Sequence, residues 1–314
     1  MNQVLATIVP VFLVIAVGYV TVRRDYVPKA HVRSIGLFVV KVALPALLVK
    51  AFSQRAFDEI MDLRYLAAYT LASLAVFAGG LFWARRVRGR DLPASAMVAL
   101  GMAASNSGFI GYPVAQHLLG APAGIALALN MIVENALILP LAFVLAERSG
   151  GGASAGAVLR QSVRNLALNP LIVAIATGFL LSLLAIRLPA PLTAAIDLLA
   201  MASAPAALFV IGGTLVGLRV SGMLGDLLQI VGGKLLLHPL AMLVALMLFP
   251  GMDPVLKMAA LTFAAMPMLS IYPILGQKYR HEEMCAAALM AATALSALSI
   301  VLVLGAVRWS GLVG

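Results

Sequence analysis

Two ionisable side chains lie deep inside stretches that are otherwise nearly uncharged, Lys41 and Glu134. Lys41 precedes Pro45 by four positions, which places its ammonium beside the carbonyl that the proline leaves without a helical partner. Asn130 and Glu134 are four positions apart, so they share one face of a helix. Lys41 could pair with a ligand carboxylate, and Glu134 could take up a proton or a cation. The competing interpretations are an internal Lys41–Glu134 ion pair, a lysine that reaches the headgroups, and a purely structural glutamate.

Two further segments combine proline, glycine and polar residues within apolar runs. They read SNSGFIGYP over 105–113 and MPMLSIYP over 266–273, and they hold the only two Tyr-Pro dipeptides of the chain. A proline inside a helix removes its own N–H donor and frees the carbonyl four residues earlier, so both segments predict broken helices. Pro113 and Pro273 suit the first turn of a second half-helix, whose N–H groups and dipole attract anions. Ordinary proline kinks are the alternative, and the matched pair favours breaks.

The elements that must position these residues are membrane helices. Of the 314 residues 63% are hydrophobic and only 11% are charged, and the mean hydropathy is +1.05. A soluble domain of ordinary composition has about 25% charged residues. The net charge of +10 comes from short basic groups beside apolar runs, with no basic groove interleaved with aromatics, which excludes a nucleic-acid-binding role. The single cysteine excludes an intramolecular disulfide, and no Cys or His cluster has metal-ligand spacing.

Charge clusters and Gly/Pro turns divide the chain into ten predicted transmembrane spans of about 20 residues or more. The predicted spans are 3–22, 32–52, 64–84, 94–117, 121–147, 166–186, 191–217, 226–249, 253–277 and 284–309. Alternate connections between these spans hold 14 of the 22 Lys and Arg residues, and the opposite face holds 6. Because cytoplasmic loops retain positive charge, the count predicts a multi-pass inner-membrane protein with both termini on the non-cytoplasmic side.

The chain also matches itself at an interval of 160 residues. Pro10 aligns with Pro170, Gly18 with Gly178, Pro45 with Pro205, and Tyr112-Pro113 with Tyr272-Pro273. The sequence therefore predicts one membrane domain, 1–314, made of two repeats, 1–150 and 161–314, joined by a Gly/Ser-rich linker over 149–156. Five spans in each half make the second half enter the membrane from the opposite side. The predicted fold is all-α, with two inverted five-helix repeats whose broken fourth and ninth helices cross near the midplane.

The segments NSGFIGYPV over 106–114, LPAL over 44–47, NPL over 169–171, FVIGGTL over 209–215 and HP at 238–239 resemble the auxin efflux carrier family. The branch often described as malonate transporters is the most similar, and the resemblance covers essentially the whole chain. It implies the same ten helices, a scaffold helix set and a substrate site at the crossing. Asn106 matches the polar residue of the first broken helix, and Pro113 and Pro273 match the crossing prolines. Met266 stands where a symmetric repeat would place a second asparagine.

These observations predict a secondary active transporter of a small organic anion, such as a malonate-like mono- or dicarboxylate, that works by alternating access. The alternative is a passive anion channel or uniporter, and a membrane receptor is a weaker alternative. No enzyme motif, catalytic residue, metal site or resident cofactor is expected. The coupling ion would be H⁺ or Na⁺, and the expected partners are the anion, the bilayer and, as an option, a second copy of the chain. The predicted coupling residues are Glu134 and Asn130. The predicted substrate-binding residues are Ser105, Asn106, Gly108, Tyr112, Pro113, Tyr272, Pro273 and Lys41. Lys234 is expected to reach the headgroups from a span end, and His238 is expected to be structural.

Overall fold

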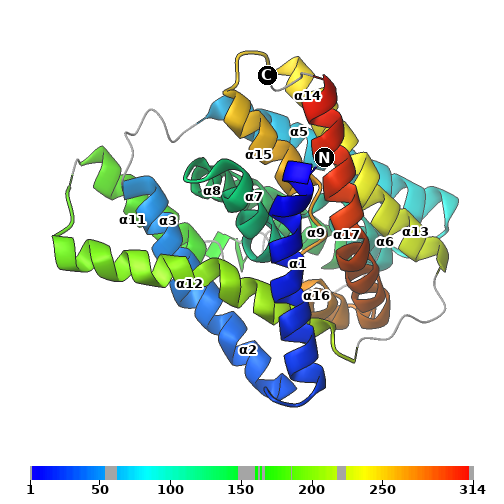
Figure 1. Ribbon diagram of the computed structural model, residues 1–314. Helices are drawn as coiled ribbons and strands as arrows, with labels where there is room; N and C mark the ends of the chain where they lie inside the picture. The colour runs from blue at the N-terminus through cyan, green and yellow to red at the C-terminus, as the bar shows by residue number, and fades with distance from the viewer. Residues whose placement is uncertain are drawn as a thin grey trace. The chain divides into compact units, whose positions relative to one another are not determined.

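The computed structural model describes residues 2–53, 62–147, 160–161, 163–164, 167–184, 186–217 and 224–310 (Figure 1). All regular elements in these ranges are helical, which agrees with the all-α prediction. The predicted linker over 149–156 lies outside them.

Six helices in the described part of the chain are long and apolar enough to cross a membrane, judged by length and composition. They are Lys29–Ser53, Leu63–Val87, Pro122–Glu147, Ala190–Leu215, Leu224–Leu248 and Glu282–Val303. Three shorter apolar helices are Val9–Arg23, Pro170–Leu183 and Pro254–Ala264. These helices overlap nine of the ten predicted spans, although Pro254–Ala264 covers only the first part of the broken span 253–277. The remaining span, 94–117, is a broken helix as well. That all ten cross a membrane stays a prediction.

Several of these helices widen by a π turn just before a proline. Such turns, each ending two residues before the proline, are Val39–Ala43 (η1), Ser107–Gly111 (η3), Glu134–Ile138 (η4) and Gly233–Leu237 (η5). A proline ring collides with the carbonyl of the preceding turn, and the wider π turn relieves that collision without ending the helix. The three ionisable residues Lys41, Glu134 and Lys234 all lie in such turns, where the regular hydrogen-bond ladder is disturbed.

The chain's internal contacts divide it into two compact units. Unit 1 comprises Met1–Leu63, Ser107–Met131 and Ala167–Gly217, and unit 2 comprises Arg64–Asn106, Ile132–Leu166 and Leu218–Gly314. Unit 1 is built from α1 (Asn2–Arg23), α2 (Lys29–Phe38), η1, α3 (Leu44–Ser53), η3, α7 (Tyr112–Leu119), most of α8 (Pro122–Val133), α11 (Pro170–Leu183) and α12 (Ala190–Leu215). In this unit α12 packs against α1, α2 and α3, and α11 packs against α3.

Close helix contacts in unit 1 recur at the 160-residue interval. A β-carbon added at Gly18 of α1 would collide with the carbonyl oxygen of Phe209 in α12. A β-carbon added at Gly178 of α11 would lie 3.1 Å from the carbonyl oxygen of Val49 in α3. Gly178 is 160 residues beyond Gly18, and Phe209 is 160 residues beyond Val49. The first helix of each predicted half therefore packs backbone to backbone against the second helix of the other half.

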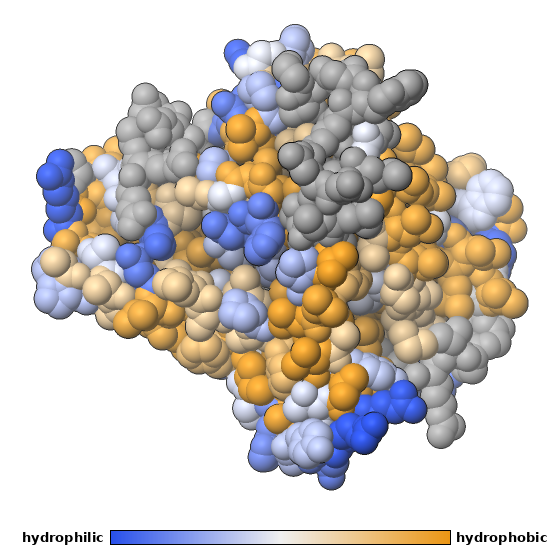
Figure 2. All heavy atoms as spheres, viewed as in Figure 1, coloured by the Kyte–Doolittle hydropathy of each residue, from blue (hydrophilic) through white to orange (hydrophobic). Residues whose placement is uncertain are grey.

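The surface of α1 is suited to lipid. Val9, Leu13, Val17 and Val20 are exposed along it, whereas Arg23 and other charged residues follow at its end. Figure 2 shows this change from apolar to hydrophilic side chains along the helix.

Unit 2 contains both helices that end in breaks. Its elements are α5 (Leu63–Phe82), η2 (Trp83–Val87), α6 (Leu92–Ala103), η4, α9 (Leu139–Glu147), α13 (Leu224–Gly232), η5, α14 (His238–Leu248), α15 (Pro254–Ala264), α16 (Tyr272–Lys278) and α17 (Glu282–Ser310). Asp91 and Asp253 cap the first turns of α6 and α15, where their carboxylates accept backbone N–H groups. The core of the unit lies where α6 packs against α9, α13 and η5.

Candidate functional site

Two helix breaks meet inside unit 2. Helix α6 ends at Ala103 and helix α15 ends at Ala264, and irregular backbone follows each. The backbone N–H of Asn106, in the first break, donates to the carbonyl oxygen of Pro267, in the second, at 2.8 Å. Irregular backbone at membrane depth must be buried in protein or line a wet cavity. Here a backbone donor of the first break is hydrogen-bonded to a backbone acceptor of the second.

Glu134 holds the first break. Its carboxylate is 1% exposed, and its Oε1 accepts the backbone N–H of Ser105 at 2.9 Å and the hydroxyl of Tyr69 at 3.4 Å. The Tyr69 hydroxyl also lies 3.1 Å from Ser105 Oγ. A carboxylate that accepts a backbone donor has a charge-assisted bond, which is stronger than a neutral one. The glutamate therefore fixes the point at which α6 stops.

Lys234, whose charge is opposite to that of Glu134, holds the second break. Its side chain is completely buried, and its Nζ donates to the carbonyl oxygen of Ala264, the last residue of α15, at 3.1 Å. The same nitrogen donates to Ser105 Oγ at 2.7 Å and lies 2.5 Å from His238 Nδ1. Ser105 thus joins the carboxylate of Glu134 to the ammonium of Lys234.

Aromatic and polar groups surround this pair. His238 is completely buried on α14, and its Nε2 lies 3.1 Å from the hydroxyl of Ser73 on α5. Tyr69 meets the edge of the imidazole with ring centroids 5.8 Å apart, and it stacks on Tyr65 at 6.0 Å. Charged groups without water are retained only where they are paired and hydrogen-bonded, and this cluster provides both. We call Tyr69, Ser73, Ser105, Glu134, Lys234 and His238 the break cluster.

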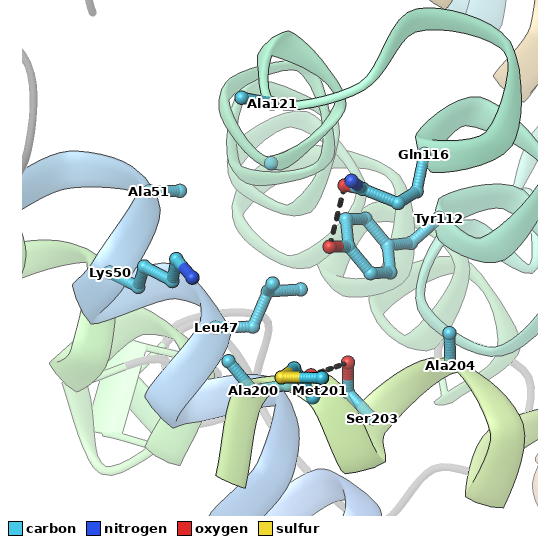
Figure 3. A pocket seen from close by; sticks show the side chains of 11 residues that line it. Leu47, Lys50, Ala51, Tyr112, Gln116, Ala121, Ala200, Met201, Ser203 and Ala204 are labelled. Atoms are coloured by element: carbon cyan, nitrogen blue, oxygen red, sulfur yellow. Dashed lines mark hydrogen bonds between the residues drawn. The ribbon is translucent and has the colours of Figure 1, made fainter. Parts of the chain in front are cut away.

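Unit 1 contains an open cavity of about 680 Å³ (Figure 3). Helices α3, α7 and α12 line it, and its polar side chains include Lys50, Tyr112, Gln116 and Ser203. The Tyr112 hydroxyl donates to Gln116 Oε1 at 2.8 Å, and Lys50 pairs with Asp197 at 2.8 Å. In Figure 3 the Lys50 ammonium points toward the cavity. An ammonium, a phenol and an amide around an otherwise apolar space suit a small organic anion.

Comparison with known proteins assigns the chain to a protein family. A family model described as membrane transport protein matches residues 3–304. The chain belongs to this family, the auxin efflux carrier family. A protein of Rhizobium meliloti (strain 1021) named "Putative malonate transporter" is 30% identical over 307 residues, 96% of this chain and 94% of that protein. "Uncharacterized transporter YfdV" of Escherichia coli (strain K12) is 26% identical over 270 residues, 84% of each chain.

Family membership confirms the resemblance that the sequence motifs predict. The family and these relatives are transporters and not enzymes, and this carrier is a multi-pass membrane protein.

The predicted substrate-binding residues of this carrier fall into both units. Ser105 and Asn106 are buried in the first break. Tyr272 and Pro273 begin α16, and the buried Tyr272 hydroxyl donates to the carbonyl oxygen of Met97 at 2.8 Å. Tyr272 thereby anchors α16 on α6. A role for any of these residues in substrate binding stays a prediction.

The other predicted residues lie in unit 1, apart from Glu134. Tyr112 and Pro113 occupy the first turn of α7, as expected, but the π turn that contains Gly108 precedes it, so the half-helix begins at Ser107. Asn130 is buried on α8, and its amide donates to Ser107 Oγ at 3.5 Å. Lys41 is exposed on η1. Their predicted roles are untested, and so is the choice between a substrate role and an ion pair for Lys41.

The interpretation of Lys234 as a headgroup-seeking lysine is wrong. The helix that carries it begins at Leu224, ten residues earlier, so the side chain lies well inside a span and is completely buried. Sequence reasoning also expected only a structural or interfacial role for His238 and gave none to Tyr69 or Ser73. The usable signal was the four-residue spacing of Lys234 and His238, which places two basic groups on one helix face just before a proline.

Charged pairs at the ends of the spans join neighbouring helices of unit 2. Arg90 and Arg88 both approach the buried carboxylate of Asp226, and Lys278 pairs with Glu147. The hydrogen bond to Glu147 raises the pKa of the Lys278 ammonium above its usual value.

Proposed function

We propose that this protein is a secondary active transporter of a small organic anion, a malonate-like mono- or dicarboxylate, and that it works by alternating access. The observation that carries the proposal is the junction of two helix breaks, bonded from Asn106 to Pro267 and held by buried groups of opposite charge. Secondary transporters build substrate and ion sites from such interrupted helices. The Rhizobium protein's name supports malonate as the substrate class. No nucleotide-binding P-loop occurs in the sequence, so drive by ATP would require another chain.

Contacts within unit 1 support the inverted repeat on which alternating access depends. The paired contacts of Gly18 with Phe209 and of Gly178 with Val49 exchange under the 160-residue shift. Two copies of one five-helix element that pack through equivalent surfaces produce this exchange. In the proposed mechanism, the cavity of unit 1 binds the anion, and Lys50 supplies a cation there.

Transport of radiolabelled carboxylates tests the proposed function. Purified protein in proteoliposomes should concentrate malonate when a pH or Na⁺ gradient is imposed, and unlabelled mono- or dicarboxylates of similar size should compete. Uptake that never exceeds the external concentration would identify a uniporter or channel instead. No uptake of any carboxylate would refute the proposal.

Asn106 is the proposed substrate ligand at the break. Because its amide is 2% exposed and its backbone joins the two breaks, Asn106→Ala should weaken malonate binding by about 1–3 kcal/mol, the cost of an unmade buried hydrogen bond. Calorimetry on purified protein measures this loss. Asn135→Ala, a half-buried asparagine on η4, is the control and should bind as the wild type does. Equal affinities for all three proteins would exclude Asn106 as a ligand.

The proposed topology places both termini on the non-cytoplasmic side of the inner membrane, with ten crossings. Ion pairs support it, because the partners of each lie in connections or near span ends that are predicted on the same face: Arg90 with Asp226, Lys278 with Glu147, and Lys50 with Asp197. Reporter fusions after Arg88 and after Gly152 should both report cytoplasm. Opposite reports from the two fusions would show that the predicted spans are divided incorrectly.

A further inference from the structure

The ammonium of Lys234 is fully coordinated. Its three acceptors are Ser105 Oγ at 2.7 Å, the carbonyl oxygen of Ala264 at 3.1 Å and His238 Nδ1 at 2.5 Å. A lysine ammonium has three N–H donors and no acceptor, so the cradle matches it one to one. Two of these three groups are neutral oxygens, the ligand type that a hard metal cation would also use. The lysine side chain thus fills the place of a bound cation between the two helix breaks.

We propose that Lys234 is the built-in cation of the break cluster and that the proton it exchanges with His238 is the coupling ion of transport. The inference rests on the proposed function and deepens it. It specifies H⁺, not Na⁺, as the coupling ion, and it identifies Lys234 as the residue that carries the proton.

The contact between Lys234 and His238 holds a single proton. While Lys234 is an ammonium, His238 Nδ1 must offer its lone pair, so the imidazole carries its proton on Nε2 and donates it to Ser73 Oγ, 3.1 Å away. Transfer breaks one N–H bond at Nζ and forms one at Nδ1, which leaves a neutral amine and an imidazolium. The imidazolium then gives its Nε2 proton to water on the side to which the cluster opens. His238 is left neutral in its other tautomer.

Loss of this proton changes contacts at both breaks. A neutral amine has two N–H donors and one lone pair, so it cannot donate to Ser105, Ala264 and His238 together. Ser105 is also bonded to Glu134 through its backbone N–H, and Ala264 ends α15. The protonation state of Lys234 therefore determines how firmly the two broken helices are held together.

Other groups share this titration. Among the described residues, Glu134 from η4 and His238 from α14 act on Lys234 directly, and Tyr69 from α5 contacts both of these groups. Helix α15 contributes the Ala264 carbonyl, and α17 reaches η5 through Ser299, whose hydroxyl donates to the Leu235 carbonyl at 2.7 Å. The pH dependence of transport belongs to this coupled set as a whole.

Proton movement with malonate tests the proposal. Wild-type proteoliposomes that contain a pH-sensitive dye should move protons with malonate, equally in Na⁺ and in choline media. Lys234→Arg keeps a cation that holds its proton at every working pH, so proton movement and uphill accumulation should be lost. Malonate exchange in the same vesicles reports how much carrier is active. Lys257→Arg changes a half-buried lysine of α15 outside the break cluster and should behave as the wild type.

Two further variants test the proposal if the Lys234→Arg protein does not fold because the larger side chain does not fit. Lys234→Gln is neutral at every pH, and His238→Gln removes the group that accepts the proton, so each should also lose proton movement. Wild-type proton movement in a Lys234 or His238 variant that exchanges malonate would overturn the proposal. Uptake that requires Na⁺ and ignores the pH gradient would overturn it as well.

A measurement without substrate separates this proposal from the proposed function. The unfolding temperatures of wild type and Lys234→Gln should differ by an amount that changes between about pH 5 and about pH 10, because only the wild type exchanges a proton at position 234. A constant difference would show that Lys234 does not titrate. A pH-dependent difference in a protein that transports no carboxylate would refute the proposed function while supporting the proton site.

Discussion

Replacing Glu134 with glutamine should abolish uphill accumulation of malonate while leaving exchange of internal for external malonate in place. The glutamine oxygen can still accept the Ser105 N–H that Glu134 Oε1 accepts at 2.9 Å, so the first break keeps its geometry. What disappears is the negative charge that balances Lys234 through Ser105. Exchange requires no net ion movement, whereas accumulation requires a coupled ion. The two activities should therefore separate, and uptake in proteoliposomes with and without an imposed pH gradient measures both.

The matched control for this substitution is Glu147→Gln. Glu147 ends α9 and pairs with Lys278 at the edge of the unit, away from the break cluster. Exposed pairs contribute about 0–1 kcal/mol to stability, so this variant should accumulate malonate as the wild type does. If Glu134→Gln concentrates malonate to the wild-type level, Glu134 has no part in energy coupling.

Adding one methyl group at Gly18 or Gly178 should destabilise the carrier strongly. At Gly18 the new carbon would collide with the Phe209 carbonyl, and at Gly178 it would lie 2.7 Å from Phe52 Cβ. Backbone contacts cannot yield as a side chain can, so each alanine should cost about 1–3 kcal/mol or more. Because the 160-residue shift relates the two contacts, the two variants should lose similar amounts. Unfolding temperatures in detergent measure the loss.

Two other glycines provide the controls. A β-carbon at Gly79 in α5 or at Gly232 in α13 would have no neighbour within 4 Å. Alanine there should stabilise the helix by up to about 1 kcal/mol, because alanine loses less backbone entropy than glycine. Unfolding temperatures for Gly18→Ala and Gly178→Ala that match those of the controls would refute the close contacts of α1 with α12 and of α11 with α3.

The helices and their breaks could be predicted because local chemistry determines them. Uncharged runs require a membrane-length helix, and the Tyr-Pro segments interrupt the backbone ladder wherever they are placed. The repeat interval was proposed from matched prolines and glycines, and Gly18 and Gly178 both lie in close helix contacts that the 160-residue shift relates. The two repeats themselves stay a prediction. The π turns were not predicted, because a proline alone does not determine them: Pro10 and Pro205 lie inside α-helices that have no π turn.

The partners of the buried charges could not be predicted because they are set by packing between distant helices. Lys234 lies 129 positions from Ser105, and no local pattern connects them. Lys41 was chosen for its spacing to Pro45, yet in the structure Lys41 lies in the π turn η1 and its side chain is exposed. A hydropathy profile places a charge along a span but does not tell which side of the helix faces protein.

The contact between α1 and α12 also constrains how the carrier is made. About 190 residues separate Gly18 from Phe209, so at about 5–20 residues per second the ribosome needs about 10–40 s to supply the partner of the first helix. During that interval α1 must reside in the bilayer without its partner, held by the exposed valines and leucine along its length. Helix α3 likewise has to reside in the bilayer until its partner α11 has been synthesised. Assembly of unit 1 is therefore a late event of biosynthesis, and a chain that stops at the end of the first predicted repeat leaves both of these helix surfaces uncovered.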